Sequence, residues 1–153
     1  HPVNRRQRQM CIRDRGIGAG YYLKKNCPNK SFCIIEGREN IGGTWDLFKY
    51  PGIRSDSDMF TLGYAFKPWK EQKTIANGPS ILSYLEETVE ENNLREKIKF
   101  SHKVLSANWN SAERNWEVRA AHHEQEILLT ANFLFMGTGY YNYDEGYTPE
   151  FDA

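Results

Sequence analysis

Hydrophobic and polar positions along the chain predict a helix and a buried strand in its first third. Residues 16–26, GIGAGYYLKKN, indicate a helix that begins with glycines and ends ahead of Pro28, which cannot continue it. The next segment, residues 31–35, is a short apolar run that stops at Glu36. Its length and composition are typical of a buried parallel strand.

A second helix is predicted over residues 79–94, with Gly78 as its N-cap and Pro79 in its first position. Its apolar residues recur at helical spacing, which makes the helix amphipathic; they are Ile81, Leu82, Leu85 and Val89. Four glutamates fall on the other side, and no histidine accompanies them. We interpret these acids as a solvated face and not as a metal site.

The second half of the chain has the two-residue period of β-strands. Residues 97–101 are a short strand candidate, and residues 103–108 and 116–121 alternate on either side of a polar turn. That arrangement indicates a hairpin, and a further strand over residues 126–130 extends it to an antiparallel β-meander.

A last apolar strand is predicted over residues 132–136, NFLFM, and Gly137, Thr138 and Gly139 follow it at once. Backbone N–H groups at such a strand end can contact a ligand at the carboxyl edge of an open α/β sheet. An ordinary exit from strand to loop is the alternative.

The stretch of residues 42–64, GGTWDLFKYPGIRSDSDMFTLGY, has no regular hydrophobic period. Paired glycines allow the backbone to approach a flat or anionic ligand, and Trp45 offers an aromatic face. Arg54 and Asp56 add a cation and a carboxylate at close spacing. A long ordered surface loop without a ligand is the alternative interpretation.

Composition narrows the class of protein. Lys+Arg and Asp+Glu are 20 each, so there is no basic excess of the kind that nucleic-acid binding requires. No apolar run is long enough to cross a bilayer. The 3 cysteines have no CxxC spacing, and their odd number argues against a disulfide framework, which favours a reducing, cytoplasmic setting. We interpret His122 and His123 as turn residues, since adjacent strand residues point to opposite faces.

Residues 1–15, HPVNRRQRQMCIRDR, differ in amino-acid composition from the rest of the chain. Their arginines and glutamines predict a solvated tail and no buried strand. We expect this tail to be disordered or not native to the protein, and the folded part to begin at Gly16.

The glycine-rich helix start, the helix, the strand and its terminal acid follow one another as in the second half of a dinucleotide-binding βαβ unit. There the helix start holds a pyrophosphate, and an acid about 20 residues further on binds the ribose, which suits Glu36. In the G-x-G-x-x-G register Gly16 is the third glycine, and Cys11 and Arg13 stand in place of the first two. A helix with small residues packed on a sheet is the alternative.

Four segments together resemble one family: CIIEGRENIGGTW, YPGIRSDSDMFTLGY, the KVLSANW…WEV meander, and FLFMGTGYYNY leading to YTPEF. They are similar to the N-terminal FAD-binding part of the flavin-containing and Baeyer–Villiger monooxygenases. The resemblance implies an α/β fold over residues 16–153, which is a partial Rossmann-like FAD-binding domain with an inserted antiparallel β-meander.

The resemblance also implies the site residues. Those expected to bind FAD are Gly16, Glu36, Gly43, Thr44, Trp45, Asp46, Leu47, Asp56, Val104, Gly137, Thr138 and Gly139. Arg54, Ser55 and Asp56 are expected on the NADP side of the flavin. Arg54 and Asp56 are the candidate catalytic residues, with Asp56 orienting an arginine from later in the chain. No metal is expected.

In such enzymes NADPH reduces FAD, O₂ adds to it, and the peroxyflavin inserts one oxygen atom into a small organic substrate. The first strand, two phosphate-turn glycines and a second dinucleotide fold are missing from the pattern, so we expect a fragment cut at both ends. We expect it not to oxidise NADPH and to bind FAD weakly or not at all. A flavoprotein of another type, such as a reductase, and a non-catalytic nucleotide-binding module stay open as alternatives.

Overall fold

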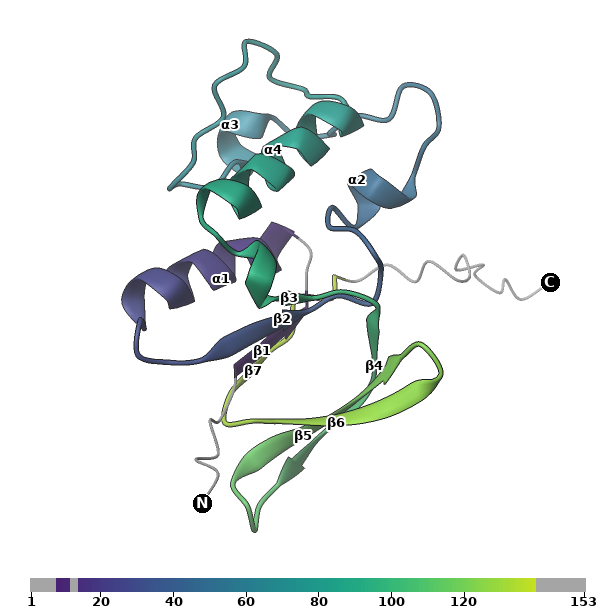
Figure 1. Ribbon diagram of the computed structural model, residues 1–153. Helices are drawn as coiled ribbons and strands as arrows, with labels where there is room; N and C mark the ends of the chain where they lie inside the picture. The colour runs from purple at the N-terminus through teal and green to yellow at the C-terminus, as the bar shows by residue number, and fades with distance from the viewer. Residues whose placement is uncertain (1–7, 12–13, 140–153) are drawn as a thin grey trace, which may run out of the picture.

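The computed structural model describes residues 8–11 and 14–139, which form two sheets and a set of helices (Figure 1). A parallel sheet has the order β3-β2-β1-β7, and an antiparallel sheet has the order β4-β5-β6. The parallel strands are β1 (Arg8–Cys11), β2 (Phe32–Ile35), β3 (Ile98–Lys99) and β7 (Leu134–Phe135). The mixed α/β class with both kinds of sheet is as predicted.

Helices cover one side of the parallel sheet, and the antiparallel sheet lies on its other side (Figure 1). The two long helices are α1 (Asp14–Asn26) and α4 (Gly78–Glu91). Short helices interrupt the loops: α2 (Thr44–Leu47), α3 (Met59–Leu62) and the 3-10 turn η1 (Arg95–Lys97). The antiparallel strands are β4 (His102–Asn110), β5 (Asn115–His122) and β6 (Gln125–Ala131).

Strand β1 corrects the prediction that residues 1–15 form a tail without a first strand. β1 lies in the middle of the parallel sheet, where Met10 pairs with Ile34 of β2 and with Phe135 of β7. The prediction was wrong because it weighed side chains, whereas ladder hydrogen bonds need only backbone groups, which every residue but proline supplies in full. The sheet therefore has no open edge at this position. That residues 1–15 are not native stays a prediction.

The core lies between the parallel sheet and the helices. All four residues of β2 are buried, as predicted for a strand inside a parallel sheet. Ile17 of α1 and Ile34 of β2 are fully buried, and Leu85 and Val89 of α4 belong to the same cluster. The predicted apolar stripe of α4 is therefore its core face.

Helix α4 begins at Gly78, one residue earlier than predicted, so its N-cap also lies one residue earlier. Asn77 is the N-cap, and its side-chain oxygen accepts a hydrogen bond from the Ser80 N–H at 2.8 Å. Gly78 was the wrong choice because it has no side chain to satisfy a free N–H of the first turn. Pro79 does occupy the first turn, as predicted.

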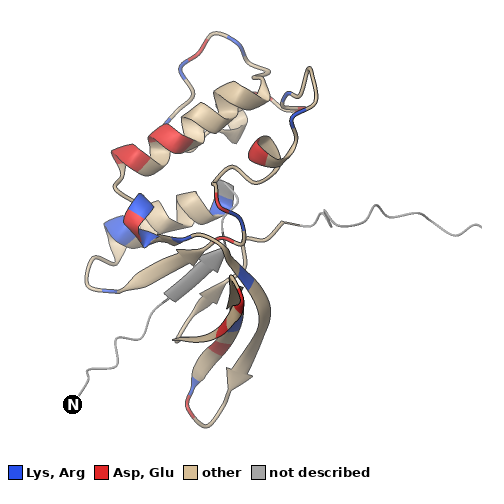
Figure 2. Cartoon of the chain, turned by 45° about the vertical axis from the view of Figure 1, so that its right-hand side comes forward, with Lys and Arg blue, Asp and Glu red and all other residues tan. Residues whose placement is uncertain are grey.

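The acidic side of α4 is exposed, as predicted, and its charges are paired. Lys67 lies 2.6 Å from Glu91 and 3.4 Å from Glu87, and Arg95 lies 3.1 Å from Glu86. Figure 2 shows the acidic segments on the later turns of this helix. Exposed pairs of this kind contribute at most about 1 kcal/mol each, so they organise the surface more than they stabilise the fold.

The predicted meander forms, with one correction. β4 and β5 pair from His102↔His122 to Asn110↔Asn115, with an irregularity between Val104 and Ser106. His122 is the last residue of β5 and its ring stacks on His102 at 4.1 Å, so assigning it to a turn was wrong. Pairing with His102 of β4 places His122 in β5.

Candidate cofactor-binding site

The carboxyl ends of β1, β2 and β7 lie at one edge of the parallel sheet, because these strands are parallel neighbours. The strand order reverses at β1, which has β2 on one side and β7 on the other. Open α/β sheets bind ligands at such a crossover. Glu36 follows β2, Gly137 follows β7, and buried Gly16 lies in the first turn of α1. The structure therefore brings these predicted site residues to one edge.

Glu36 is a buried carboxylate at this edge, with only 7% of its surface exposed. Its backbone N–H donates to the Lys99 carbonyl at 2.9 Å, and its carbonyl accepts from the His102 N–H at 2.8 Å. Its Oε1 accepts from the Arg38 N–H at 3.1 Å. Backbone bonds on both sides thus fix the position of the acid at the end of β2.

The start of the meander lies beside this acid. A Cβ on Gly37 would lie 3.6 Å from the Cα of Lys103, in ordinary contact. Val104 is the next residue along β4 and is half-buried. Val104, the residue predicted to lie beside the adenine, is therefore the direct neighbour of Lys103, which lies close to Gly37.

The loop that carries most of the predicted FAD residues contains α2. The backbones of Gly42 and Gly43 have φ of 104° and 49°, which are left-handed values. Trp45 N–H donates to the Gly42 carbonyl at 2.9 Å, and the Trp45 side chain packs on the core cluster. Leu47 is 37% exposed. Trp45 is thus half-buried where the loop meets the core, whereas Leu47, at the end of α2, is exposed to solvent.

Sequence reasoning missed Arg38. Its Nη1 donates to the Gly43 carbonyl at 2.8 Å, and its Nη2 lies 2.5 Å from the Asp46 carboxylate. Lys49 approaches the other Asp46 oxygen at 3.3 Å. No helical or strand period connects positions 38 and 46, so only the acid two residues earlier hinted at a role.

Arg54, Ser55 and Asp56 lie in a segment fastened to the start of α4. Ser55 N–H donates to the Ala76 carbonyl at 2.9 Å, and Arg54 forms a β-bridge with Asn77. Ser55 is buried, whereas Arg54 and Asp56 are exposed. Among the described residues, no ion pair joins them.

These residues fit most of an FAD molecule and depart from it at one place. The buried acid, the loop at residues 42–47 and the strand end at residue 137 suit the ribose and the ring system. Residues 12 and 13, which separate β1 from α1 in the sequence, lie outside the described residues. In place of the first two glycines of a pyrophosphate turn, the chain has Cys11 and Arg13.

No family model matches the chain. The FAD-containing monooxygenase EthA of Mycolicibacterium smegmatis is 54% identical over 136 residues, which are 89% of this chain and 28% of that relative. A crystal structure of OTEMO in complex with FAD and NADP has a TM-score of 0.76 at 26% identity, over 89% of this chain and 26% of the other. An epsilon-caprolactone-bound cyclohexanone monooxygenase has a TM-score of 0.78 at 26% identity, over 88% and 26%.

The chain belongs to the FAD-containing monooxygenase family. It spans about 28% of the length of the curated relative EthA. The family expected from the four sequence segments is therefore confirmed. The part of its last segment from Tyr140 onward lies outside the described residues.

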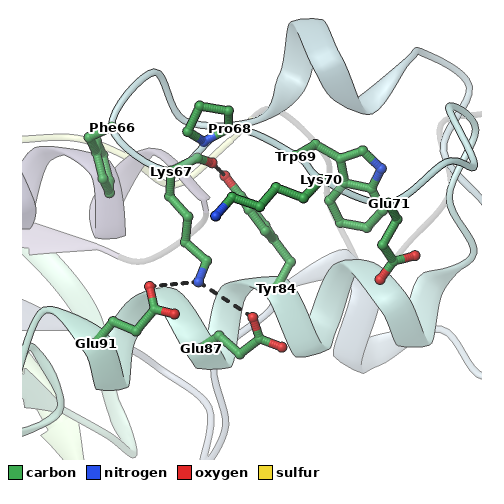
Figure 3. Close-up of a pocket in the computed structure, with 9 residues that line it drawn as sticks. All are labelled: Phe66, Lys67, Pro68, Trp69, Lys70, Glu71, Tyr84, Glu87 and Glu91. Atoms are coloured by element: carbon green, nitrogen blue, oxygen red, sulfur yellow. Dashed lines mark hydrogen bonds and ion pairs between the residues drawn. The ribbon is translucent and has the colours of Figure 1, made fainter.

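This segment of an FAD-containing monooxygenase also has a cavity of about 350 Å³ that shares no residue with the predicted site (Figure 3). It lies between residues 66–71 and α4, and its lining includes Phe66, Trp69, Tyr84 and Glu71. Figure 3 shows Lys67 crossing it towards Glu87 and Glu91. The chain thus partly fills this space with its own ammonium group.

Tyr84→Phe is expected to destabilise this region by about 1–2 kcal/mol. The Tyr84 hydroxyl accepts from the Tyr64 N–H at 2.8 Å and donates to the Lys67 carbonyl, so its loss removes two bonds that hold residues 64–67 on α4. Urea unfolding followed by circular dichroism measures the change. Tyr50→Phe, at a side chain that is 58% exposed, is the matched control and should stay within about 0.5 kcal/mol. Equal effects of the two variants would contradict the assignment.

Neither a membrane-spanning helix nor a metal cluster occurs among the described residues. None of their helices has both the length and the apolar character needed to cross a membrane. Within the same residues, no group of three or more His, Cys, Asp or Glu side chains is arranged to hold a metal ion.

Proposed function

We propose that this chain forms the FAD-binding part of an enzyme that uses NADPH and O₂ to insert one oxygen atom into a small organic substrate. The substrate class is a ketone or a sulfur or nitrogen compound. FAD, when bound, carries the electrons from NADPH and activates O₂. The chain's own residues bind that cofactor, orient it and shield part of it from water.

The buried Glu36 carboxylate at the sheet crossover is the observation that carries this proposal. Glu36 is only 7% exposed and stands at the end of a parallel strand, which is where ribose hydroxyls are bound in dinucleotide folds. Val104 would offer its backbone to the adenine, and Gly16 would lie under the pyrophosphate. The fold would then be a Rossmann-like FAD domain with an inserted meander.

The other predicted residues have roles at the ring system. Gly43, Thr44, Trp45, Asp46 and Leu47 would wrap the cofactor, and residues 137–139 would close over it from β7. Arg54 and Asp56 would face the NADPH side, held there by the bridge to Asn77. Asp56 would orient a neighbouring cation, since a carboxylate attracts a positive charge within a few ångströms.

The alternatives have less support. A reductase or a non-catalytic module would share the sheet crossover, but EthA and cyclohexanone monooxygenase, to which this chain is similar, are monooxygenases. We place the protein in the cytoplasm, because its 3 cysteines, an odd number without CxxC spacing, argue against a disulfide framework. O₂ and a small-molecule substrate are the partners that this function requires.

Glu36→Gln is expected to weaken FAD binding about tenfold, because the neutral amide loses the charge-assisted hydrogen bonds to the ribose. Quenching of flavin fluorescence over a titration measures the dissociation constant. Glu39→Gln, at an exposed acid three positions on, removes the same charge and should leave the constant unchanged. Equal affinity of the parent chain and Glu36→Gln would contradict the proposal.

A further inference from the structure

Arg38 connects the end of β2 to the loop that carries α2. Its backbone N–H donates to Glu36, and its backbone carbonyl accepts from the Ser101 N–H at 2.9 Å. Its guanidinium contacts the Gly43 carbonyl at 2.8 Å and the Asp46 carboxylate at 2.5 Å. One residue therefore links the buried acid, the β3–β4 connection and the loop.

These contacts constrain the loop at two points. The Gly43 carbonyl also accepts from the Leu47 N–H at 2.9 Å, so the guanidinium contacts the first turn of α2 from outside. Asp46 lies inside that turn and its side chain is only 12% exposed. A four-residue helix is not stable alone, so it depends on contacts like these. A guanidinium can contact both acceptors at once because its donors form a fixed fork.

We infer that Arg38 is a positioning residue that holds residues 42–47 in the conformation that receives the dinucleotide. This inference rests on the proposed function for its ligand and on the four contacts for its mechanism. The side chain acts through the loop: it aligns Gly43, Thr44 and Trp45 with the end of β2, where Glu36 would bind the ribose of the same FAD molecule.

Hydrogen exchange of the whole chain without ligand tests the hold on the loop. In Arg38→Ala, the amides of Trp45 and Leu47 are expected to exchange about tenfold faster, while those of Val118 and Ala120 in the meander stay unchanged. Arg119→Ala is the matched control, because Arg119 makes a 2.6 Å pair with Glu126 on the meander, outside this loop. Unchanged exchange at Trp45 and Leu47 in Arg38→Ala would overturn the inference.

FAD titration tests whether the constraint that Arg38 places on the loop increases the affinity for FAD. Arg38→Ala is expected to bind FAD about tenfold more weakly than Arg119→Ala. Arg38→Lys keeps the charge and loses the fork, so we expect it to resemble Arg38→Ala in both measurements. FAD affinity restored by lysine without protection of the loop would show a direct charge contact and overturn the positioning role. If neither the parent chain nor its variant with Cys11→Gly and Arg13→Gly binds FAD up to millimolar ligand, the proposed function fails, while the exchange rates still decide the role of Arg38.

Discussion

Replacing Cys11 and Arg13 together by glycine is expected to raise the affinity for FAD about 100-fold. The first glycine of a pyrophosphate turn allows the tight bend from strand to helix, and the second lets the backbone approach the phosphates. β1 and α1 already stand on either side of this turn, with only residues 12 and 13 between them. Two backbone N–H groups that reach a charged phosphate each contribute about 1.5 kcal/mol, which gives the expected factor.

The charge of the turn needs its own control. Arg15→Gly removes one positive charge from the same helix start but creates no glycine at either position of the pattern. It should lower FAD affinity slightly or leave it unchanged, because a cation near a phosphate is favourable. An increase with Arg15→Gly equal to that of the double variant would mean that the glycines are not the cause.

The sequence predicted those elements whose evidence is local. Residues 31–35 are apolar throughout, and every residue of β2 is buried. The stripe of Ile81, Leu85 and Val89 predicted α4 and its core face. Glu36 could be placed at a site because strand ends and ligand sites coincide in parallel sheets. In each case a single segment contains the signal.

The sequence could not predict β1, because the reason for that strand lies outside it. Residues 8–11 are polar for a central strand, and their backbone pairs with residues 32–35 on one side and with β7 on the other. The polar side chains of residues 8–11 therefore led to the wrong prediction of a tail, because strand pairing depends on the neighbouring strands and not on this segment alone. The same holds for His122, which its pairing with His102 assigns to β5.

In the candidate site too, residues with a local sequence signal could be predicted, whereas a residue that acts through a distant contact could not. Gly43 and Asp46 were predicted from the resemblance, yet the side chain that connects them to the sheet, Arg38, was not. No periodic rule relates an arginine to a carboxylate eight residues away across a loop. The contact between Gly42 and Leu82 joins that loop to α4 over a still longer separation. Such contacts decide the shape of the loop and are visible only in three dimensions.

Gly42→Ala is therefore expected to destabilise the fold by about 3 kcal/mol, through two costs that can be separated. Its φ of 104° is unfavourable for any residue with a Cβ, and that Cβ would lie 2.5 Å from the Leu82 Cδ1. Gly52→Ala has the first cost alone, since its φ is 82° and nothing lies within 4 Å, so about 1 kcal/mol is expected. Urea unfolding measures both variants. The contact cost should shrink when Leu82→Ala is added to Gly42→Ala, because the methyl group that obstructs the Cβ is then gone. If Gly42→Ala and Gly52→Ala are equally destabilised, the loop does not pack on α4 as described, and the alignment of residues 42–47 with Glu36 must have another cause.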